Sequence, residues 1–317
     1  MTTSTANGPR TQAQASAPGS LMVFGEHAVL HGHLAICCAI DRRITVTATR
    51  RSDGRVRVVS ALGERETTMA SPDCAPPFQF ALQVVGEFAR EQTKGLAGGV
   101  ALNIESEFRD DQGLGSSAAV TVATHAALDL LHGHFRSHRD LLERCRGVVR
   151  RVQGIGSGAD VAASILGGVV AYRAEPLEMH RIAGALELVA AYSGAKEKTA
   201  VVVAKVDGLR ARHPDPVERI YRAMDAVARD AATAIGMGDW QRVGELMNIG
   251  QGLMEAIGVS TPKLAGMLEG LRATPGILGG KISGSGLGDC VIALGKPDGA
   301  TLPLLPVAVS GRGVEHR

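Results

Sequence analysis

A glycine-rich turn, Gly113-Leu114-Gly115-Ser116-Ser117, directly precedes an Ala-rich stretch over residues 118–131 that is typical of an α-helix. Glycine turns at helix N-termini direct several backbone N–H groups toward one point, where the helix dipole also favours negative charge. The turn is therefore predicted to bind phosphate. Taken alone, the same motif also fits a tight turn that only starts a helix.

Glycine is abundant throughout the chain: 40 of its 317 residues are glycine, whereas ordinary usage of about 7 % would give about 22. The surplus has no Gly-X-Y period, and 45 % of the residues are hydrophobic. These features exclude collagen and low-complexity disorder, so the glycines are predicted to lie in folded loops. Two further clusters occupy residues 154–158 and 279–288. Neither a P-loop motif nor a Rossmann Gly-x-Gly-x-x-Gly motif occurs.

Charge and composition exclude several classes of partner. The net charge is +2, the basic and acidic residues are interleaved, and only ten residues are aromatic, which argues against nucleic-acid binding. The longest apolar run, over residues 34–40, is too short to span a membrane. The five cysteines show neither a CxxC pair nor metal-ligand spacing, so we expect a cytoplasmic protein. They are Cys37, Cys38, Cys74, Cys145 and Cys290.

The order of the expected elements predicts an α+β fold with two lobes. Residues 1–16 have the composition of a disordered tail, residues 17–180 form the first lobe, and residues 181–317 form the second. Alternating apolar residues predict strands that include residues 44–49, 100–104, 186–192 and 200–206, whereas helical spacing predicts helices over residues 78–92, 118–131, 141–152, 161–165, 216–235, 240–257 and 261–272.

Several motifs in a fixed order resemble those of the GHMP kinases. The segment from Ala17 to Gly32 resembles the first motif of that family, the turn at residues 113–119 resembles its ATP loop, and the segment from Lys281 to Leu294 is similar to its third motif. The resemblance implies ATP as phosphoryl donor and an active site between two lobes. It further implies an N-terminal lobe like domain 2 of ribosomal protein S5 and a ferredoxin-like C-terminal lobe.

The resemblance assigns the nucleotide and catalytic roles residue by residue. Asp160 matches the aspartate that orients or deprotonates the acceptor hydroxyl, although an aspartate at this position also fits a cap of the helix over residues 161–165. Ser117 matches the serine that contacts Mg²⁺ and phosphate. The residues assigned to ATP are Gly113, Leu114, Gly115, Ser116, Ser117 and Ala118.

The substrate residues implied by the resemblance come from four segments: Glu26, His27, Ser157, Thr199, Gly284, Ser285 and Gly286. His27 would not stand out among ten histidines without its motif, and a capping or strand-edge role for Thr199 is an open alternative. Asn248 and Gln251 lie on an expected helix, and a simple solvated position is an open alternative for both.

Two positions depart from the family pattern. Ser20 stands where the first motif usually has a lysine that partners the catalytic aspartate, and Val149 stands where mevalonate kinases carry a metal-binding glutamate. Phosphoryl transfer depends on positioning and electrostatic stabilisation. Another cation must therefore supply the charge, or Mg²⁺ and the loop amides suffice. The candidate cations are Arg150, Lys196, Lys198 and Lys281.

The first motif resembles the mevalonate kinase branch of the family, which implies that a small alcohol, mevalonate, is the acceptor in isoprenoid precursor synthesis. The Gly-Asp-Cys sequence at Gly288 and the segment from Val152 to Ser164 look more like phosphomevalonate kinases, so phosphomevalonate or another hydroxy acid or sugar is an alternative acceptor. The losses at Ser20 and Val149 also motivate a nucleotide-binding regulator without kinase activity. Because dimers are frequent in this family, a homodimer is an expected assembly.

Overall fold

A long antiparallel ribbon forms the centre of the first lobe. In the computed structural model, which describes residues 10–91, 98–109, 112–299 and 302–316, β1 (Gln12–Phe24) pairs with β2 (Ala35–Arg51) along most of its length. The large sheet has the order β12-β1-β2-β5-β3-β4, and β6 pairs with both β2 and β7. Its other strands are β3 (Arg55–Ser60), β4 (Gly63–Thr68), β5 (Gly99–Ser106), β6 (Val169–Arg173), β7 (Glu178–Ile182) and β12 (Glu315–His316).

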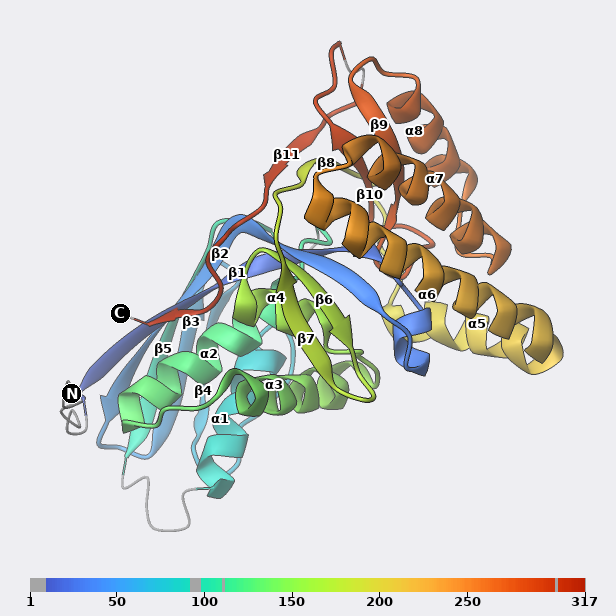
Figure 1. Cartoon of the computed structure of the whole chain (residues 1–317). Helices are drawn as coiled ribbons and strands as arrows, with labels where there is room; N and C mark the ends of the chain where they lie inside the picture. Colours follow the sequence, from blue (N-terminus) through green and yellow to red (C-terminus); the bar gives the residue numbers. More distant parts are fainter. Residues whose placement is uncertain (1–9, 92–97, 110–111, 300–301, 317) are drawn as a thin grey trace, which may run out of the picture.

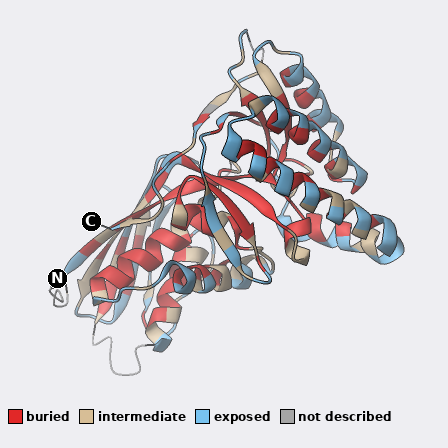
Figure 2. Cartoon of the chain, viewed as in Figure 1, coloured by how far each residue is buried: buried red, intermediate tan, exposed pale blue. Residues whose placement is uncertain are grey.

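Four helices cover one face of this sheet (Figure 1). They are α1 (Gln79–Glu91), α2 (Ser116–His132), α3 (His138–Gln153) and α4 (Ala159–Leu166). Helix α2 packs against β1 and β2 and is buried on nearly every side, as Figure 2 shows in red. Its small Ala residues allow this close contact with the strands. The glycine turns that precede α2 and α4 are thus attached to buried helices.

The second lobe consists of a smaller sheet covered by helices. Its order is β11-β8-β10-β9, with every pairing antiparallel. Helices α7 and α8 pack on β9 and β10, and α6 packs on α7 and α5. The elements are β8 (Glu187–Tyr192), α5 (Thr199–Arg212), α6 (Pro214–Met237), α7 (Trp240–Ala256), α8 (Pro262–Arg272), β9 (Ile277–Ser283), β10 (Cys290–Gly295) and β11 (Leu305–Ala308). The two sheets with their helices confirm the predicted two-lobed α+β architecture.

Strand β1 begins inside the segment predicted as a tail, whereas the large sheet ends close to the predicted boundary between the lobes. Residues 12–16 begin β1, where Ala13, Ala15 and Ser16 are buried, whereas residues 1–9 lie outside the described part of the chain. The first sheet extends to Ile182 through β7. The C-terminus then returns to it, because β12 pairs with β1 beside Ala15 and Ser16. So short a strand has no sequence signal of its own.

The strand predicted over residues 200–206 is also wrong, since these residues form the first half of α5. Val202, Val203 and Val206 are its buried side chains, and this spacing matches one face of a helix. Short Val-rich runs fit a strand or a buried helix equally well, so periodicity alone could not decide. The other helices that were predicted are present within a few residues of their expected ends. Among the described helices, none is long and apolar enough to cross a bilayer.

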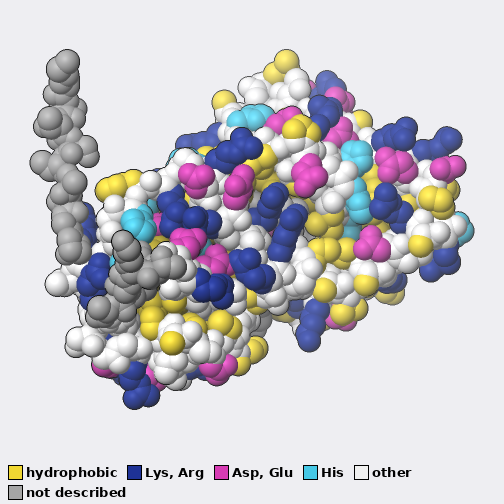
Figure 3. Space-filling view, turned by 90° about the horizontal axis from the view of Figure 1, so that it is seen from below, with side chains coloured by type: hydrophobic (Ala, Val, Ile, Leu, Met, Phe, Trp, Pro, Cys, Tyr) yellow, Lys and Arg dark blue, Asp and Glu magenta, His cyan; other side chains and the backbone are white. Residues whose placement is uncertain are grey.

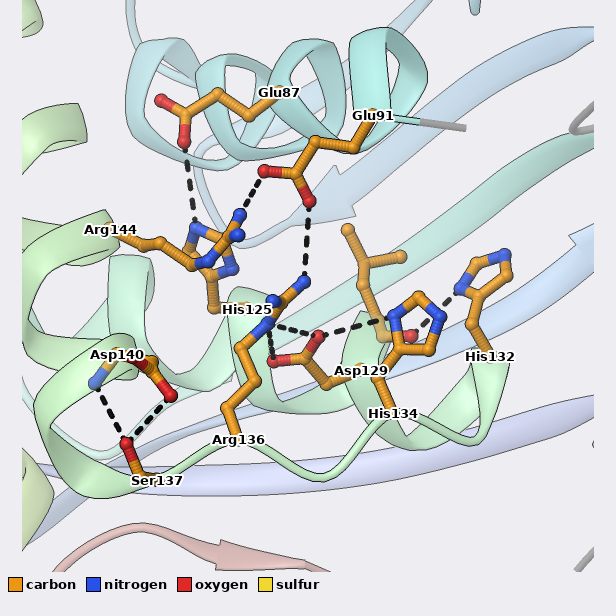
Figure 4. Close-up of polar contacts among 11 residues, drawn as sticks. Glu87, Glu91, His125, Asp129, His132, His134, Arg136, Ser137, Asp140 and Arg144 are labelled. Carbon is orange, nitrogen blue, oxygen red and sulfur yellow. Dashed lines mark hydrogen bonds and ion pairs between the residues drawn. The ribbon is translucent and has the colours of Figure 1, made fainter. Parts of the chain in front are cut away.

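A buried histidine lies between α1, α2 and α3 (Figure 4). His125 is fully buried, neither ring nitrogen has a hydrogen-bond partner, and its ring packs beside Phe88. Glu87, 3.9 Å away, and the Asp129–Arg136 ion pair border it. Burial lowers the pKa of His125 to about 4, because a charged imidazolium would lose its hydration there.

This depressed pKa makes stability depend on pH. Because unfolded histidine titrates near 6.5, the unfolded chain binds the extra proton first, and the stability present above pH 6.5 is lost as the pH falls toward 4. We expect His125→Leu to reduce the loss of unfolding free energy between pH 7.5 and 5 by about 2 kcal/mol. Urea unfolding at both pH values measures this difference. His138→Leu, at an exposed position on α3, should leave this loss unchanged. An equal loss of unfolding free energy in His125→Leu and wild type would contradict a lowered pKa of His125.

Candidate active site

A cleft of about 950 Å³ opens between the two lobes. Its walls come from β1 and the turn after it, from the starts of α2, α4 and α5, and from the loop after β9. The cleft collects every residue predicted for the site except Gly286: it is lined by Ser20, Glu26, His27, Gly113, Leu114, Gly115, Ser116, Ser117, Ala118, Ser157, Asp160, Thr199, Gly284 and Ser285.

The turn before α2 is fixed tightly against β1. Gly115 has a left-handed backbone (φ 71°), and a Cβ there would collide with Ser20 Oγ. The backbone N–H of Ser20 donates to the Leu114 carbonyl at 3.0 Å. The first amides of a helix have no carbonyl partner within the helix, so this turn presents N–H donors to the cleft. Such an arrangement suits an anion with several oxygens.

Asp160 lies in the first turn of α4, beside Ser20. The Ser20 hydroxyl donates to Asp160 Oδ1 at 2.9 Å, and Ser164 Oγ of the same helix donates to the Pro18 carbonyl at 2.8 Å. Burial raises the pKa of the Asp160 carboxyl, and the Ser20 hydrogen bond and the positive charge of Lys196 act in the opposite direction. Ser20 of β1 thus holds the Asp160 carboxylate at the edge of the anion site, where the carboxylate can accept a proton.

The loop that leads into α4 is held by a buried tyrosine. Tyr172 on β6 donates its hydroxyl hydrogen to the Ser157 carbonyl at 2.7 Å, and Ser157 Oγ accepts from the N–H of Ala159 at 3.2 Å. Both contacts fix the backbone just before Asp160. Tyr172 carried no signal in the sequence, because its partner is a backbone atom far along the chain.

Glu26 is bound by a buried lysine. Lys281 on β9 donates to Glu26 Oε1 and to the Ile282 carbonyl, and both charged side chains are almost completely buried. Glu26 lines the cleft, whereas Lys281 lies behind it. Burial lowers the pKa of Lys281, and the charge of Glu26 opposes this shift. Of the four candidate cations, Lys281 is therefore engaged in an ion pair that connects the two lobes.

His27 joins the same two segments. Its Nε2–H donates to the Ser285 carbonyl at 2.8 Å, and burial lowers its pKa below the usual value. The neutral ring then leaves Nδ1 as an acceptor. Thr199 is exposed at the start of α5 and borders the cleft. Gly286 instead packs against Val259, away from the cleft.

Two side chains for which solvation was one alternative hold β9 in place. Asn248 Oδ1 accepts from the N–H of Gly280 at 3.1 Å, and the buried Gln251 accepts from the N–H of Ile282 at 2.9 Å. Both lie on α7, and the helical pattern alone could not show which face packs on the sheet. They fix the strand that carries Lys281.

Asp289 was not singled out from the sequence but lies in the cleft. Its carboxylate faces Gly113 and is 3.8 Å from Lys196 Nζ. In the sequence, its place directly after a run of glycines was the one available signal. In the structure its backbone is left-handed (φ 69°). Within the described residues there is no cluster of three or more His, Cys, Asp or Glu side chains that could hold a metal.

One face of the molecule carries charged side chains of both signs. On the face shown in Figure 3, Lys and Arg side chains alternate with Asp and Glu side chains and hydrophobic patches. This face offers no continuous basic stripe of the kind that binds a phosphate backbone.

Comparisons with known proteins agree with this geometry. The sequence matches the GHMP kinase N-terminal domain over residues 79–168 and the GHMP kinase C-terminal domain over residues 223–301. It is 34 % identical to a mevalonate kinase of Aeropyrum pernix, with 90 % of each chain covered.

Solved structures share the fold. The Lin0012 protein of Listeria innocua superposes with a TM-score of 0.83 at 22 % identity, covering 96 % of this chain and 99 % of the other. The L. major mevalonate kinase in complex with R-mevalonate superposes with a TM-score of 0.79 at 24 % identity, covering 97 % and 99 %.

The buried ion pair gives a stability prediction. Removing one partner leaves an uncompensated buried charge, so Glu26→Gln or Lys281→Met alone should lower the free energy of unfolding by about 3–5 kcal/mol. The double variant should lose much less than the sum of the two single losses, because neither charge remains. Urea unfolding of the four proteins measures this coupling, and additive losses would show that the pair is not a unit.

Proposed function

We propose, since the chain belongs to the GHMP kinase family, that it transfers the terminal phosphoryl group of ATP to the primary hydroxyl of mevalonate. The family consists of ATP-dependent phosphotransferases that act on hydroxyl groups. The relatives matched along nearly the whole chain carry the name mevalonate kinase. The observation that carries the proposal is the Asp160 carboxylate, held by Ser20 beside the glycine turn of α2.

In the proposed mechanism, the turn of α2 binds the phosphates through its backbone N–H groups and through Ser116 and Ser117. Asp160 accepts a hydrogen bond from the acceptor hydroxyl and takes its proton as the oxygen attacks phosphorus. The raised pKa of this carboxyl makes it a stronger base than an exposed aspartate. The Ser20 hydroxyl keeps Oδ1 engaged and so fixes the orientation of the carboxylate.

The acceptor is proposed to lie on the side of the cleft formed by Glu26, His27 and Thr199. Val29, Leu30 and Val203 add an apolar wall there, which suits the methyl and methylene groups of mevalonate. Among the described residues that line the cleft, the basic ones are Arg42, Arg109 and Lys196. Arg42 and Arg109 belong to the region where β2 passes the end of β5, which leaves Lys196 on the acceptor side.

Mg²⁺ is proposed to enter with ATP. The donors present fit such an ion, because Asp160, Asp289 and Ser117 offer hard oxygen ligands, and Asp289 Oδ1 is buried without a hydrogen-bond partner. Magnesium bound with nucleotides takes one or two carboxylates and completes its shell with phosphate oxygens and water. When bound, it would neutralise negative charge on the phosphates.

Phosphomevalonate is the second candidate acceptor and rests on the Gly-Asp-Cys sequence at Gly288. A second phosphate group would need further cations around the acceptor. Among the described residues, one lysine lines that side of the cleft, which is too few for the transferring phosphoryl group and a second phosphate together and so favours mevalonate over phosphomevalonate.

An acceptor panel with a base variant tests the proposal. ADP release should be rapid with mevalonate and slow with phosphomevalonate or galactose. Asp160→Asn should lower kcat by about 10²–10⁴-fold, as expected for loss of general base help, while nucleotide affinity stays within a few fold. Asp230→Asn, an exposed carboxylate on α6, is the matched control and should keep full activity.

Two outcomes would refute the proposal. Turnover with another alcohol but not with mevalonate would reassign the acceptor. Tight ATP binding without phosphorylation of any acceptor would instead support a nucleotide-binding regulator.

A further inference from the structure

The carboxylate of Asp160 lies beside a neutral serine, Ser20, at a position where a lysine would help phosphoryl transfer. Ser20 donates to Asp160 but carries no charge. Gly115 packs on one side of Ser20 Oγ, and Ser20 also borders the cleft. Negative charge on the transferring group must therefore be met from another segment of the cleft.

Three of the four candidate cations are committed elsewhere or lie outside the cleft. Arg150, on α3, donates to the Gly156 carbonyl of the loop that follows this helix at 2.7 Å. Lys281 is buried in the ion pair with Glu26. Lys198 precedes α5 and is not part of the cleft wall. Lys196, in contrast, lines the cleft on the same side as Thr199.

The backbone around Lys196 is attached to the glycine loop that follows β9. The N–H of Asp289 donates to the Ala195 carbonyl at 2.6 Å, and the N–H of Ser193 donates to the Asp289 carbonyl at 2.8 Å. A side chain at Gly288 would strike the Ala195 carbonyl. The two segments therefore form one unit across which a lysine and an aspartate face each other.

The Asp289 side chain lies between the lysine and the phosphate turn. Its Oδ2 is 3.8 Å from Lys196 Nζ, and its carboxyl group would collide with a Cβ at Gly113. The Lys196 side chain is 41 % exposed, so its ammonium is not immobilised.

We propose that Lys196 supplies the cation for the transferring phosphoryl group in place of the residue missing at Ser20, and that Asp289 is its positioning residue. The inference rests on the proposed function. The ammonium moves from Asp289 toward the oxygens of the transferring group, where charge is spread in the transition state. Asp160 keeps the role of base: it takes the acceptor proton as the acceptor oxygen bonds to the terminal phosphorus of ATP, and ADP leaves.

Substitution of Lys196 tests the role directly. Lys196→Ala should lower kcat at least 10²-fold, the loss expected when one transition-state donor is removed, while KM for ATP changes little. Lys196→Arg should retain part of the activity. Lys198→Ala, two residues away and outside the cleft, is the matched control and should behave as wild type.

A second-site variant distinguishes a missing charge from a damaged fold. Ser20→Lys in the Lys196→Ala background should raise kcat at least tenfold, because it places an ammonium beside Asp160 from β1. Asp289→Asn should lower kcat, yet add no further loss when Lys196 is already alanine. A purely structural role of Asp289 would give independent losses in the Asp289→Asn and Lys196→Ala variants, and an absent rescue by Ser20→Lys would show that the loss in Lys196→Ala is not a missing charge.

A transition-state mimic makes the test independent of the acceptor. ADP with aluminium fluoride should bind Lys196→Ala at least tenfold more weakly than wild type, whereas ADP alone should bind both proteins equally. If wild type fails to phosphorylate mevalonate but this difference in binding is found, the proposed acceptor is wrong and the role of Lys196 stands. Equal binding of the mimic to both proteins, or an unchanged kcat in Lys196→Ala, would overturn the inference.

Discussion

The buried ion pair between Glu26 and Lys281 is the constraint on which the cleft depends. Glu26 follows the end of β1 in the first lobe, and Lys281 lies on β9 of the second. Two charges removed from water are stable only when they are paired closely, so the lobes have little freedom to separate here. The pair thereby sets the distance between the glycine turn of α2 and the loop after β9. The hydrogen bond between His27 and Ser285 joins the same two segments of the chain next to this ion pair.

The charges of the site are divided between the lobes in consequence. The first lobe provides the phosphate turn and the base Asp160, whose partner Ser20 is neutral. The second provides Lys196 and Asp289 on a shared loop unit. A site divided in this way is complete only when the lobes are held together. The fold therefore places the structural ion pair behind the cleft and leaves the exposed lysine to face the substrates.

The sequence could predict the parts that depend on local pattern. Apolar spacing located α2 and α6, and the glycine motifs led to the turn at Gly113 and to Asp160. Long-range pairing was out of reach: β12 is two residues long, and Lys196 and Asp289 meet only because β8 and β10 are neighbours. The valines at the start of α5 fitted two periods, and their burial in the second lobe decided for the helix. The sequence shows that residue 281 is a lysine, but its burial could not be predicted.

The most direct measurement of the central claim is the ³¹P NMR spectrum of a reaction that contains the wild-type protein, ATP, Mg²⁺ and mevalonate. Transfer to the primary hydroxyl predicts ADP and one new phosphomonoester resonance in equal amounts, the latter split into a triplet by the two protons of the adjacent methylene. An unsplit ester resonance, which indicates the tertiary hydroxyl, inorganic phosphate as the only product, or unchanged ATP would contradict the account.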